Sequence, residues 1–255
     1  MSRAAYDEIA GWYDAAVREG PLAPFHDWIV PIVVGLAGEV RDRSVCDLAC
    51  GQGVVARRLA DRGARVLGVD LSGELLDLAR SYERGEPRGV EYSRADARAL
   101  DGLSDGAFDG VVCNMSLMDI PDLDATLGAV SRVLRPGGWF VFSVVHPICQ
   151  TPGSPWWVRE DDAIVGVEVR DYFSEGHWRR GNPEGIRGRL GAHHRTLSTY
   201  VNGLARAGLK IEHLLEPRAT GLYAETAPVH RDVPVALVVR CERGDARPVP
   251  AGPAA

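Results

Sequence analysis

Short apolar runs alternate with stretches of helical periodicity through the middle of the chain. A run of about five apolar residues is typical of a buried strand, and apolar residues recurring every three or four positions are typical of an amphipathic helix. This alternation predicts a mostly parallel α/β sheet. The predicted strands are residues 45–49, 65–69, 90–94, 108–113 and 139–145, and the predicted helices between them are residues 54–62, 73–84 and 123–134.

The pattern differs on either side of this central region. Residues 4–19 and 25–36 have helical spacing, with Pro31 as a kink or a boundary in the second helix. Residues 146–194 are rich in Pro, Gly, Trp and Arg and contain an alternating run at 163–173. Such a long insertion is typical of a lid or a binding loop. A helix at 196–207 and strands at 209–215 and 233–241 complete the predicted elements.

The same boundaries divide the chain into functional parts. We expect residues 1–38 to close over a site, and residues 39–145 to form the ligand-binding core. Residues 146–194 are expected to form a cap that binds substrate, and residues 195–246 to complete the core with a hairpin. The Pro- and Ala-rich residues 247–255 predict a disordered tail.

Composition and charge narrow the class of protein. The 255 residues carry a net charge of −6, which gives no electrostatic footprint for nucleic acid, and the basic clusters 179–180 and 187–189 are interpreted as solvated loops. Five cysteines without a C-x-x-C pair predict neither a disulfide framework nor a zinc site, and no other metal ligands cluster. No apolar signal core and no run of membrane-spanning length occurs, so we expect a cytoplasmic protein with no membrane partner.

The first predicted strand runs directly into a glycine turn. Gly51 and Gly53 permit a sharp turn and a close approach of a ligand, and the next helix points its amides at that ligand. With Ala56 they also satisfy the G-x-G-x-x-A pattern of dinucleotide folds. Asp47 precedes the turn, where a carboxylate suits a cationic amine and has no use beside a pyrophosphate. Asp70 and an acidic residue at position 96 end the next two strands.

These motifs together resemble those of class I S-adenosylmethionine-dependent methyltransferases. Residues 47–53 resemble the first motif, D/E-x-x-x-G-x-G, residues 68–72 the second, 95–97 the third, and 134–138 the late turn. The resemblance implies a Rossmann-like seven-stranded, mostly parallel sheet with helices on both faces and an antiparallel last strand. It also implies S-adenosyl-L-methionine as cofactor and S-adenosyl-L-homocysteine as product. The insertion and the N-terminal helices would form a cap on that fold.

The resemblance assigns roles to the ends of the second and third strands. Asp70 would accept hydrogen bonds from the ribose hydroxyls, and Leu71 would flank the adenine ring. Asp96 would accept from the adenine amino group, and the backbone amide of Ala97 would donate to a ring nitrogen. The alternatives are a charge at a helix N-terminus for the first carboxylate and an Asp turn for the second.

The methionine end of the cofactor is assigned to the glycine turn. Asp47 would meet the ammonium through water or local amides, and the carbonyls near Ala49 and Gly51 would accept from it. Asn114 resembles the family residue whose backbone carbonyl meets the same ammonium. The alternatives are a carboxylate bonded only to the turn amides, and turn chemistry alone at the asparagine.

Aromatic residues are candidates for covering the site. Tyr13 resembles the N-terminal aromatic residue that covers the cofactor in many relatives, and Tyr6 is a second candidate. Either residue can instead belong to the core stripe of the first helix. His177 and Trp178 in the insertion can line an acceptor pocket or form the core of the cap.

Candidates for catalysis are histidines and one aspartate. His146 follows the last parallel strand, where an imidazole can serve as a general base or simply bond to backbone. His193 and His194 precede the helix at 196–207, and one of them can face the acceptor or both can serve helix entry. Asp119 can contact substrate or cap a turn.

The leading functional hypothesis is methyl transfer to a small molecule, with an aromatic compound or a natural product as candidate acceptor, by in-line displacement with a histidine as candidate base. A different class is an NAD(P)-dependent oxidoreductase on a related sheet. A methyltransferase for a macromolecule is disfavoured because residues 114–117 read Asn-Met-Ser-Leu and not Asn-Pro-Pro-Tyr. A non-catalytic cofactor-binding protein is the remaining alternative.

Overall fold

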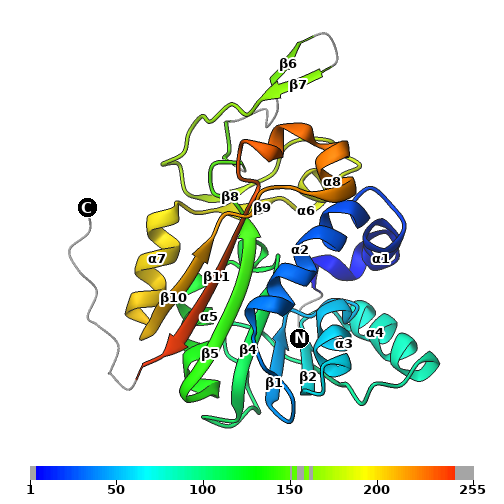
Figure 1. Ribbon diagram of the computed structural model, residues 1–255, viewed down its shortest axis with the longest axis vertical. Helices are drawn as coiled ribbons and strands as arrows, with labels where there is room; N and C mark the ends of the chain where they lie inside the picture. The colour runs from blue at the N-terminus through cyan, green and yellow to red at the C-terminus, as the bar shows by residue number, and fades with distance from the viewer. Residues whose placement is uncertain (1–3, 150, 154–157, 161–162, 245–255) are drawn as a thin grey trace.

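A computed structural model of the chain describes residues 4–149, 151–153, 158–160 and 163–244. Its centre is a seven-stranded sheet with strand order β10-β11-β5-β4-β1-β2-β3 (Figure 1). The strands are β1 (Ser44–Leu48), β2 (Arg65–Asp70), β3 (Glu91–Arg94), β4 (Phe108–Asn114), β5 (Leu134–Val145), β10 (Leu209–Leu215) and β11 (Ala236–Arg243). β11 is antiparallel to both β5 and β10, and the other pairs are parallel, so the predicted fold class is confirmed.

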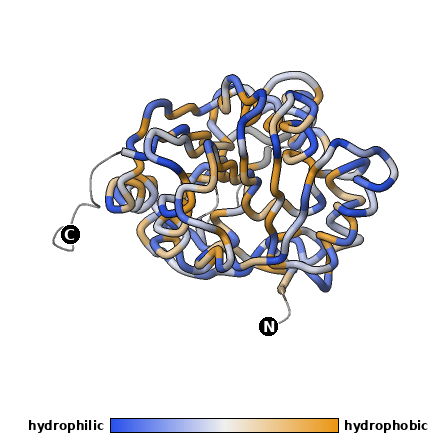
Figure 2. Tube along the Cα trace, turned by 90° about the horizontal axis from the view of Figure 1, so that it is seen from below, coloured by the Kyte–Doolittle hydropathy of each residue, from blue (hydrophilic) through white to orange (hydrophobic). Residues whose placement is uncertain are grey.

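Helices cover both faces of this sheet. α5 (Leu123–Val133) and α7 (Leu197–Arg206) pack on one face, and α2 (Ala23–Leu36) and α3 (Val54–Asp61) pack on the other. The remaining helices are α1 (Ala10–Arg18), α4 (Gly73–Gly85), α6 (Ile186–Leu190) and α8 (Gly221–Thr226), with 3-10 turns η1 (Ala5–Glu8), η2 (Leu117–Asp119) and η3 (Pro228–Arg231). Successive strand residues point to opposite faces. Val111 packs in the core under α5 and α7, whereas Val112 packs in the core under α2 and α3. Figure 2 shows the hydrophobic segments gathered in the centre of the fold.

Most predicted elements agree with the structure to within a few residues, and the larger differences have identifiable causes. The helix predicted at 4–19 is divided into η1 and α1, because Ile9 leaves the helical region at φ −122° and ψ 8°. β5 begins at Leu134, within the predicted helix 123–134, because Leu134 already pairs with Phe108 of β4. Of the alternating run at 163–173, only Ala163–Gly166 forms a strand.

The insertion lies above the carboxyl ends of the parallel strands (Figure 1). Its hairpin of β6 (Val158–Glu160) and β7 (Ala163–Gly166) extends away from the body, and β8 (Gly176–Trp178) pairs antiparallel with β9 (Ala192–His194). The sequence did not predict α8 and η3, which lie between the last two strands. The prediction for residues 247–255 lies outside the described residues.

Candidate active site

The turn after β1 requires left-handed backbone at three positions. Ala49, Gly51 and Gly53 have φ of 54°, 55° and 85°. A Cβ atom at Gly53 would lie 2.3 Å from the hydroxyl oxygen of Tyr92, so a side chain fits neither the backbone nor the space. α3 starts directly after Gly53, and the turn therefore lies between the end of β1 and the start of a helix.

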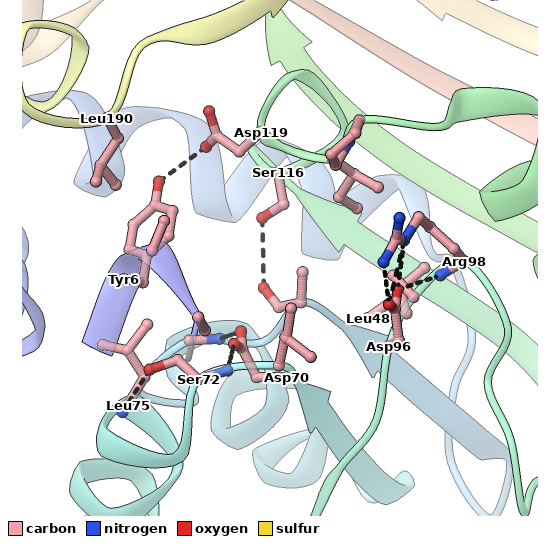
Figure 3. Close-up of a pocket in the computed structure, with 18 of the residues that line it drawn as sticks. Tyr6, Leu48, Asp70, Ser72, Leu75, Asp96, Arg98, Ser116, Asp119 and Leu190 are labelled. Carbon is pink, nitrogen blue, oxygen red and sulfur yellow. Dashed lines mark hydrogen bonds and ion pairs between the residues drawn. The ribbon is translucent and has the colours of Figure 1, made fainter. Parts of the chain in front are cut away.

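Asp70 fixes this turn from the end of β2. Its Oδ2 accepts from the amide of Gly51 and its Oδ1 accepts from the amide of Ser72, both at 2.8 Å (Figure 3). A carboxylate has about four lone-pair positions, so acceptor capacity remains for a ligand. Burial raises the pKa of Asp70 above its ordinary range, because the charged form loses solvation.

A cavity of about 340 Å³ opens beside this carboxylate. Most residues predicted to bind the cofactor lie on its wall, namely Tyr13, Ala49, Gly51, Asp70, Leu71, Asp96 and Ala97. They come from α1 and from the carboxyl ends of β1, β2 and β3. The structure brings together the strand-end residues Ala49 and Ala97, which are 48 positions apart in the sequence, because parallel strands end at one edge of the sheet.

Asp96 has an ion-pair partner that the sequence did not indicate. Arg98 donates to both of its carboxylate oxygens, with 2.6 Å between Nη2 and Oδ2, and this pairing lowers the pKa of Asp96. Arg98 also lies on the cavity wall. The only sequence feature that could have suggested this ion pair is the spacing of two positions between Asp96 and Arg98.

Three predicted cofactor residues lie behind the wall. Asp47 is 1% exposed, its Oδ2 has no hydrogen-bond partner within the described part of the chain, and burial raises its pKa to about 8. Gly53 is closed off by Tyr92. The side chain of Asn114 accepts from Ser143 and its carbonyl accepts from Ser116 Oγ. These three residues do not line the cavity, and their roles in cofactor binding stay a prediction.

The far end of the cavity is built from the N-terminal segment and the insertion. The rings of Tyr6 and Tyr13 meet edge to face at 5.3 Å. The Tyr6 hydroxyl donates to Asp119 Oδ2 at 2.8 Å (Figure 3), and Arg187 donates to the other oxygen of the same carboxylate. Asp119 thus binds two protein side chains, and the sequence-based alternative of a simple turn cap is incomplete.

Only one of the three predicted catalytic histidines lines the cavity. His193 lies on the wall, and burial together with Arg195 and His177 lowers its pKa. His177 is on the wall too, with ring centroids 5.1 Å from His193, since the two residues are paired across β8 and β9.

The other two histidines are occupied elsewhere. His146 Nε2 bonds to Glu216 Oε1 at 2.8 Å, and its Nδ1 accepts from the amide of Ile148. His194 Nε2 bonds to the carbonyl of Tyr172 at 2.7 Å. His146 does not line the cavity in which we expected it, because its ring turns toward Glu216 in the segment after β10.

Arg187 is a second correction. The sequence placed it in a solvated basic loop, but it is 8% exposed and ion-paired with Asp119. Arg195, also buried, donates to the carbonyls of Leu117, Ile120 and Pro121 and holds the loop that carries Asp119. Neither contact has a local sequence signal, because the partners are more than 65 residues apart.

Comparison with known proteins identifies the family. A methyltransferase-domain family model matches residues 46–142. The crystal structure of an S-adenosylmethionine-dependent methyltransferase from Mesorhizobium loti is 32% identical, with a TM-score of 0.72, covering 84% of this chain and 96% of that one. A structure described as a putative enzyme of the same class from Listeria monocytogenes is 25% identical, with a TM-score of 0.70, covering 84% of this chain and 97% of that one. The chain belongs to the S-adenosylmethionine-dependent methyltransferases, and the oxidoreductase alternative is set aside.

A second group of relatives has names that specify a reaction, but these proteins match a shorter region of the chain. The ubiquinone biosynthesis O-methyltransferase of Paracidovorax citrulli is 33% identical over 146 residues, which is 56% of this chain and 60% of that protein. The chain therefore spans about three fifths of the length of the curated relatives it matches. Among the described residues, no helix has the length and apolarity to cross a membrane, and no three His, Cys, Asp or Glu side chains form a metal-binding group.

Proposed function

We propose that this protein transfers a methyl group from S-adenosylmethionine to a hydroxyl group of an uncharged small molecule. The observation that carries the proposal is one cavity whose wall includes the carboxylates Asp70 and Asp96 from the strand ends and the imidazole of His193 from the insertion. The carboxylates suit a nucleoside, and the imidazole suits a group that loses a proton.

The residues at the strand ends fit the cofactor. Asp70 keeps acceptor capacity for ribose hydroxyls, and Leu71 and Ala97 offer apolar surface and a backbone amide for the adenine. Gly51 leaves the wall open where a Cβ would approach Tyr13. The buried Oδ2 of Asp47 has no hydrogen-bond partner in the described part of the chain, so it offers an acceptor beside the turn that suits the methionine ammonium through water. The bound cofactor supplies an electrophilic methyl group on a sulfonium.

The charges around the cavity favour a neutral acceptor. Asp70 is bonded to backbone amides, Asp96 to Arg98 and Asp119 to Arg187. Arg98 and Arg187 therefore each have a carboxylate partner already, and neither is left to pair with an anionic acceptor. His193 is therefore the polar side chain that we assign to recognition of the acceptor.

His193 is proposed as the general base. Its lowered pKa keeps the imidazole neutral at pH 7, so that it can take the proton of a hydroxyl as the oxygen attacks. The insertion that carries it, residues 146–194, is proposed to act as a cap, because His177, Leu190 and His193 close the cavity from above. A covered cavity excludes water and aligns the two reactants.

The names of the curated relatives support oxygen as the acceptor atom. They are O-methyltransferases, and the methyltransferase-domain family model covers residues 46–142, which include the ends of β1, β2 and β3. Only the identity of the acceptor atom, oxygen, is inferred from these relatives, and the acceptor molecule itself is not.

The test is methyl transfer from radiolabelled S-adenosylmethionine to a panel of phenols, catechols and their amine and carboxylate analogues. Transfer to hydroxyl compounds is expected, with analogues bearing an added carboxylate used poorly. A His193→Gln variant should lose transfer and keep S-adenosylhomocysteine binding. Transfer only to RNA or protein substrates added as a separate arm would contradict the proposal.

A further inference from the structure

Asp119 connects the two segments that cover the cavity. Its Oδ2 accepts from Tyr6 in η1, and its Oδ1 accepts from Arg187 in α6. We call residues 5–18 the N-terminal cover and residues 186–193 the insertion cover. One carboxylate from the loop after β4 therefore binds a side chain from each cover.

Further hydrogen bonds hold Arg187, the loop of Asp119 and the N-terminal cover in place. Arg187 Nη1 also donates to the carbonyl of Gly191 at 3.0 Å, within the insertion cover. Arg195 fixes the loop of Asp119 through three backbone carbonyls. The N-terminal cover is anchored at the cofactor end, where Asp7 accepts from the Ser72 hydroxyl at 2.6 Å. The Asp119 side chain consequently cannot move far without changing its contacts with both covers.

A second contact joins the same two covers. The guanidinium of Arg189 lies 4.9 Å from the centre of the Trp12 ring, a distance typical of a cation–π contact. Arg189 belongs to α6 and Trp12 to α1. The covers therefore touch each other directly as well as through Asp119.

Both covers contribute to the wall of the cavity. Tyr6 and Tyr13 line it from the N-terminal cover, and Leu190 and His193 line it from the insertion cover. Figure 3 shows Tyr6 between Ser72 below and Leu190 above, with its hydroxyl directed at Asp119. In the function proposed above, the cofactor lies under the first cover and the acceptor under the second.

We propose that Asp119 is a positioning residue that makes the N-terminal cover and the insertion cover open and close together. Cofactor bound under the first cover then also orders the second, so the acceptor half of the cavity is complete only when cofactor is present. Arg187, which does not line the cavity, contributes to cofactor affinity through this carboxylate. The inference rests on the proposed cofactor site, whose occupancy the wild-type arm of the test measures separately.

The test is amide hydrogen exchange with and without S-adenosylhomocysteine, supported by calorimetric titration of the same ligand. Tyr6→Phe removes one hydroxyl from the N-terminal cover, and Arg187→Lys keeps the buried charge but shortens its reach. Tyr172→Phe is the matched control, since its hydroxyl accepts from the Leu197 amide at 2.9 Å and does not contact Asp119.

In the wild type, the ligand should slow exchange in both covers in parallel. Tyr6→Phe should speed exchange in residues 186–193, and Arg187→Lys should speed exchange in residues 5–18 and weaken ligand binding by about three- to tenfold. Tyr172→Phe should do neither. Faster exchange confined to the substituted cover, with ligand affinity unchanged in Arg187→Lys, would overturn the inference. Absence of binding to the wild type would instead reject the proposed cofactor site.

Discussion

Asp70 accepts a hydrogen bond from the amide of Gly51, so the carboxylate that ends β2 fixes the turn that ends β1. The two residues are 19 positions apart and meet because parallel strands β1 and β2 end side by side. The turn is thereby ordered by the protein itself, and little conformational entropy remains to be lost when a ligand binds there.

The tightest steric constraint near the turn is Gly53 against Tyr92. Gly53→Ala is expected to destabilise the fold by about 1–3 kcal/mol for a strained left-handed residue, plus the cost of the contact with the tyrosine hydroxyl. Gly102→Ala is the matched control, because Gly102 has a similar φ of 83° with no atom within 4 Å of the added Cβ. Urea unfolding gives the free energy of unfolding of both variants. The difference between their losses is the cost of the contact between the added Cβ atom and the Tyr92 hydroxyl.

The hydroxyl of Tyr92 is itself buried without a hydrogen-bond partner in the described part of the chain. Tyr92→Phe should therefore be neutral or stabilising, and it should recover part of the stability lost in Gly53→Ala. Equal losses in the Gly53 and Gly102 variants, with no recovery in the double variant, would show that the hydroxyl contact is unimportant.

Asp47 predicts a specific pH dependence of stability in the free protein. Burial raises its pKa from the ordinary 3.8 to about 8, so the folded state holds a proton that the unfolded chain releases between about pH 4 and 8. The free energy of unfolding should consequently fall as the pH rises through that window, by at most about 1.4 kcal/mol per pH unit. Asp47→Asn keeps the shape and does not titrate.

The measurement is urea unfolding of the wild type and Asp47→Asn at pH 5, 6.5 and 8. The difference in stability between them should grow in favour of Asp47→Asn as the pH rises. Two curves that stay parallel across this range would mean that Asp47 is ionised and compensated in the folded protein.

His193 predicts the pH dependence of turnover. Because burial and neighbouring cations lower its pKa, the neutral form should persist, and activity should hold, to a pH below the ordinary imidazole value of 6.5. His193→Gln should lower turnover by about 10²–10⁴ and remove this acidic limb. Single-turnover methyl transfer between pH 5 and 9 measures both effects.

His146→Gln is the control for that experiment. Its ring nitrogens bond to Glu216 and to the Ile148 amide, so turnover should keep the wild-type pH profile. A variant at His146 that lost the acidic limb while His193→Gln retained it would reverse the assignment of the base.

The cofactor half of the site was predictable because its signals are local. The apolar run 45–49, the glycines of the turn and the acidic residues at strand ends each lie within a short motif, and the sheet topology then brings them together. The predicted strand 45–49 ends one residue too late, because Ala49 has a left-handed φ of 54° and β1 therefore ends at Leu48.

The acceptor half was not predictable in the same way. Tyr6 and Asp119 are 113 positions apart, and His146 and Glu216 are 70 apart, with no periodic pattern that links them. The insertion supplies a buried arginine where composition suggested a solvated loop, because Arg187 has a carboxylate to pair with only in the folded chain. Polar contacts between distant segments depend on the tertiary fold, which a single sequence does not specify residue by residue.

The most direct test of the central claim is calorimetric titration of S-adenosylhomocysteine into the wild type, Asp70→Ala and His193→Gln. The claim is that the cavity at the carboxyl ends of β1, β2 and β3 holds the cofactor through Asp70. The wild type should bind one equivalent, Asp70→Ala should bind at least about tenfold more weakly because charge-assisted hydrogen bonds are lost, and His193→Gln should bind like the wild type. Circular dichroism spectra should match across the three proteins. Equal affinity of the wild type and a folded Asp70→Ala variant would contradict the account.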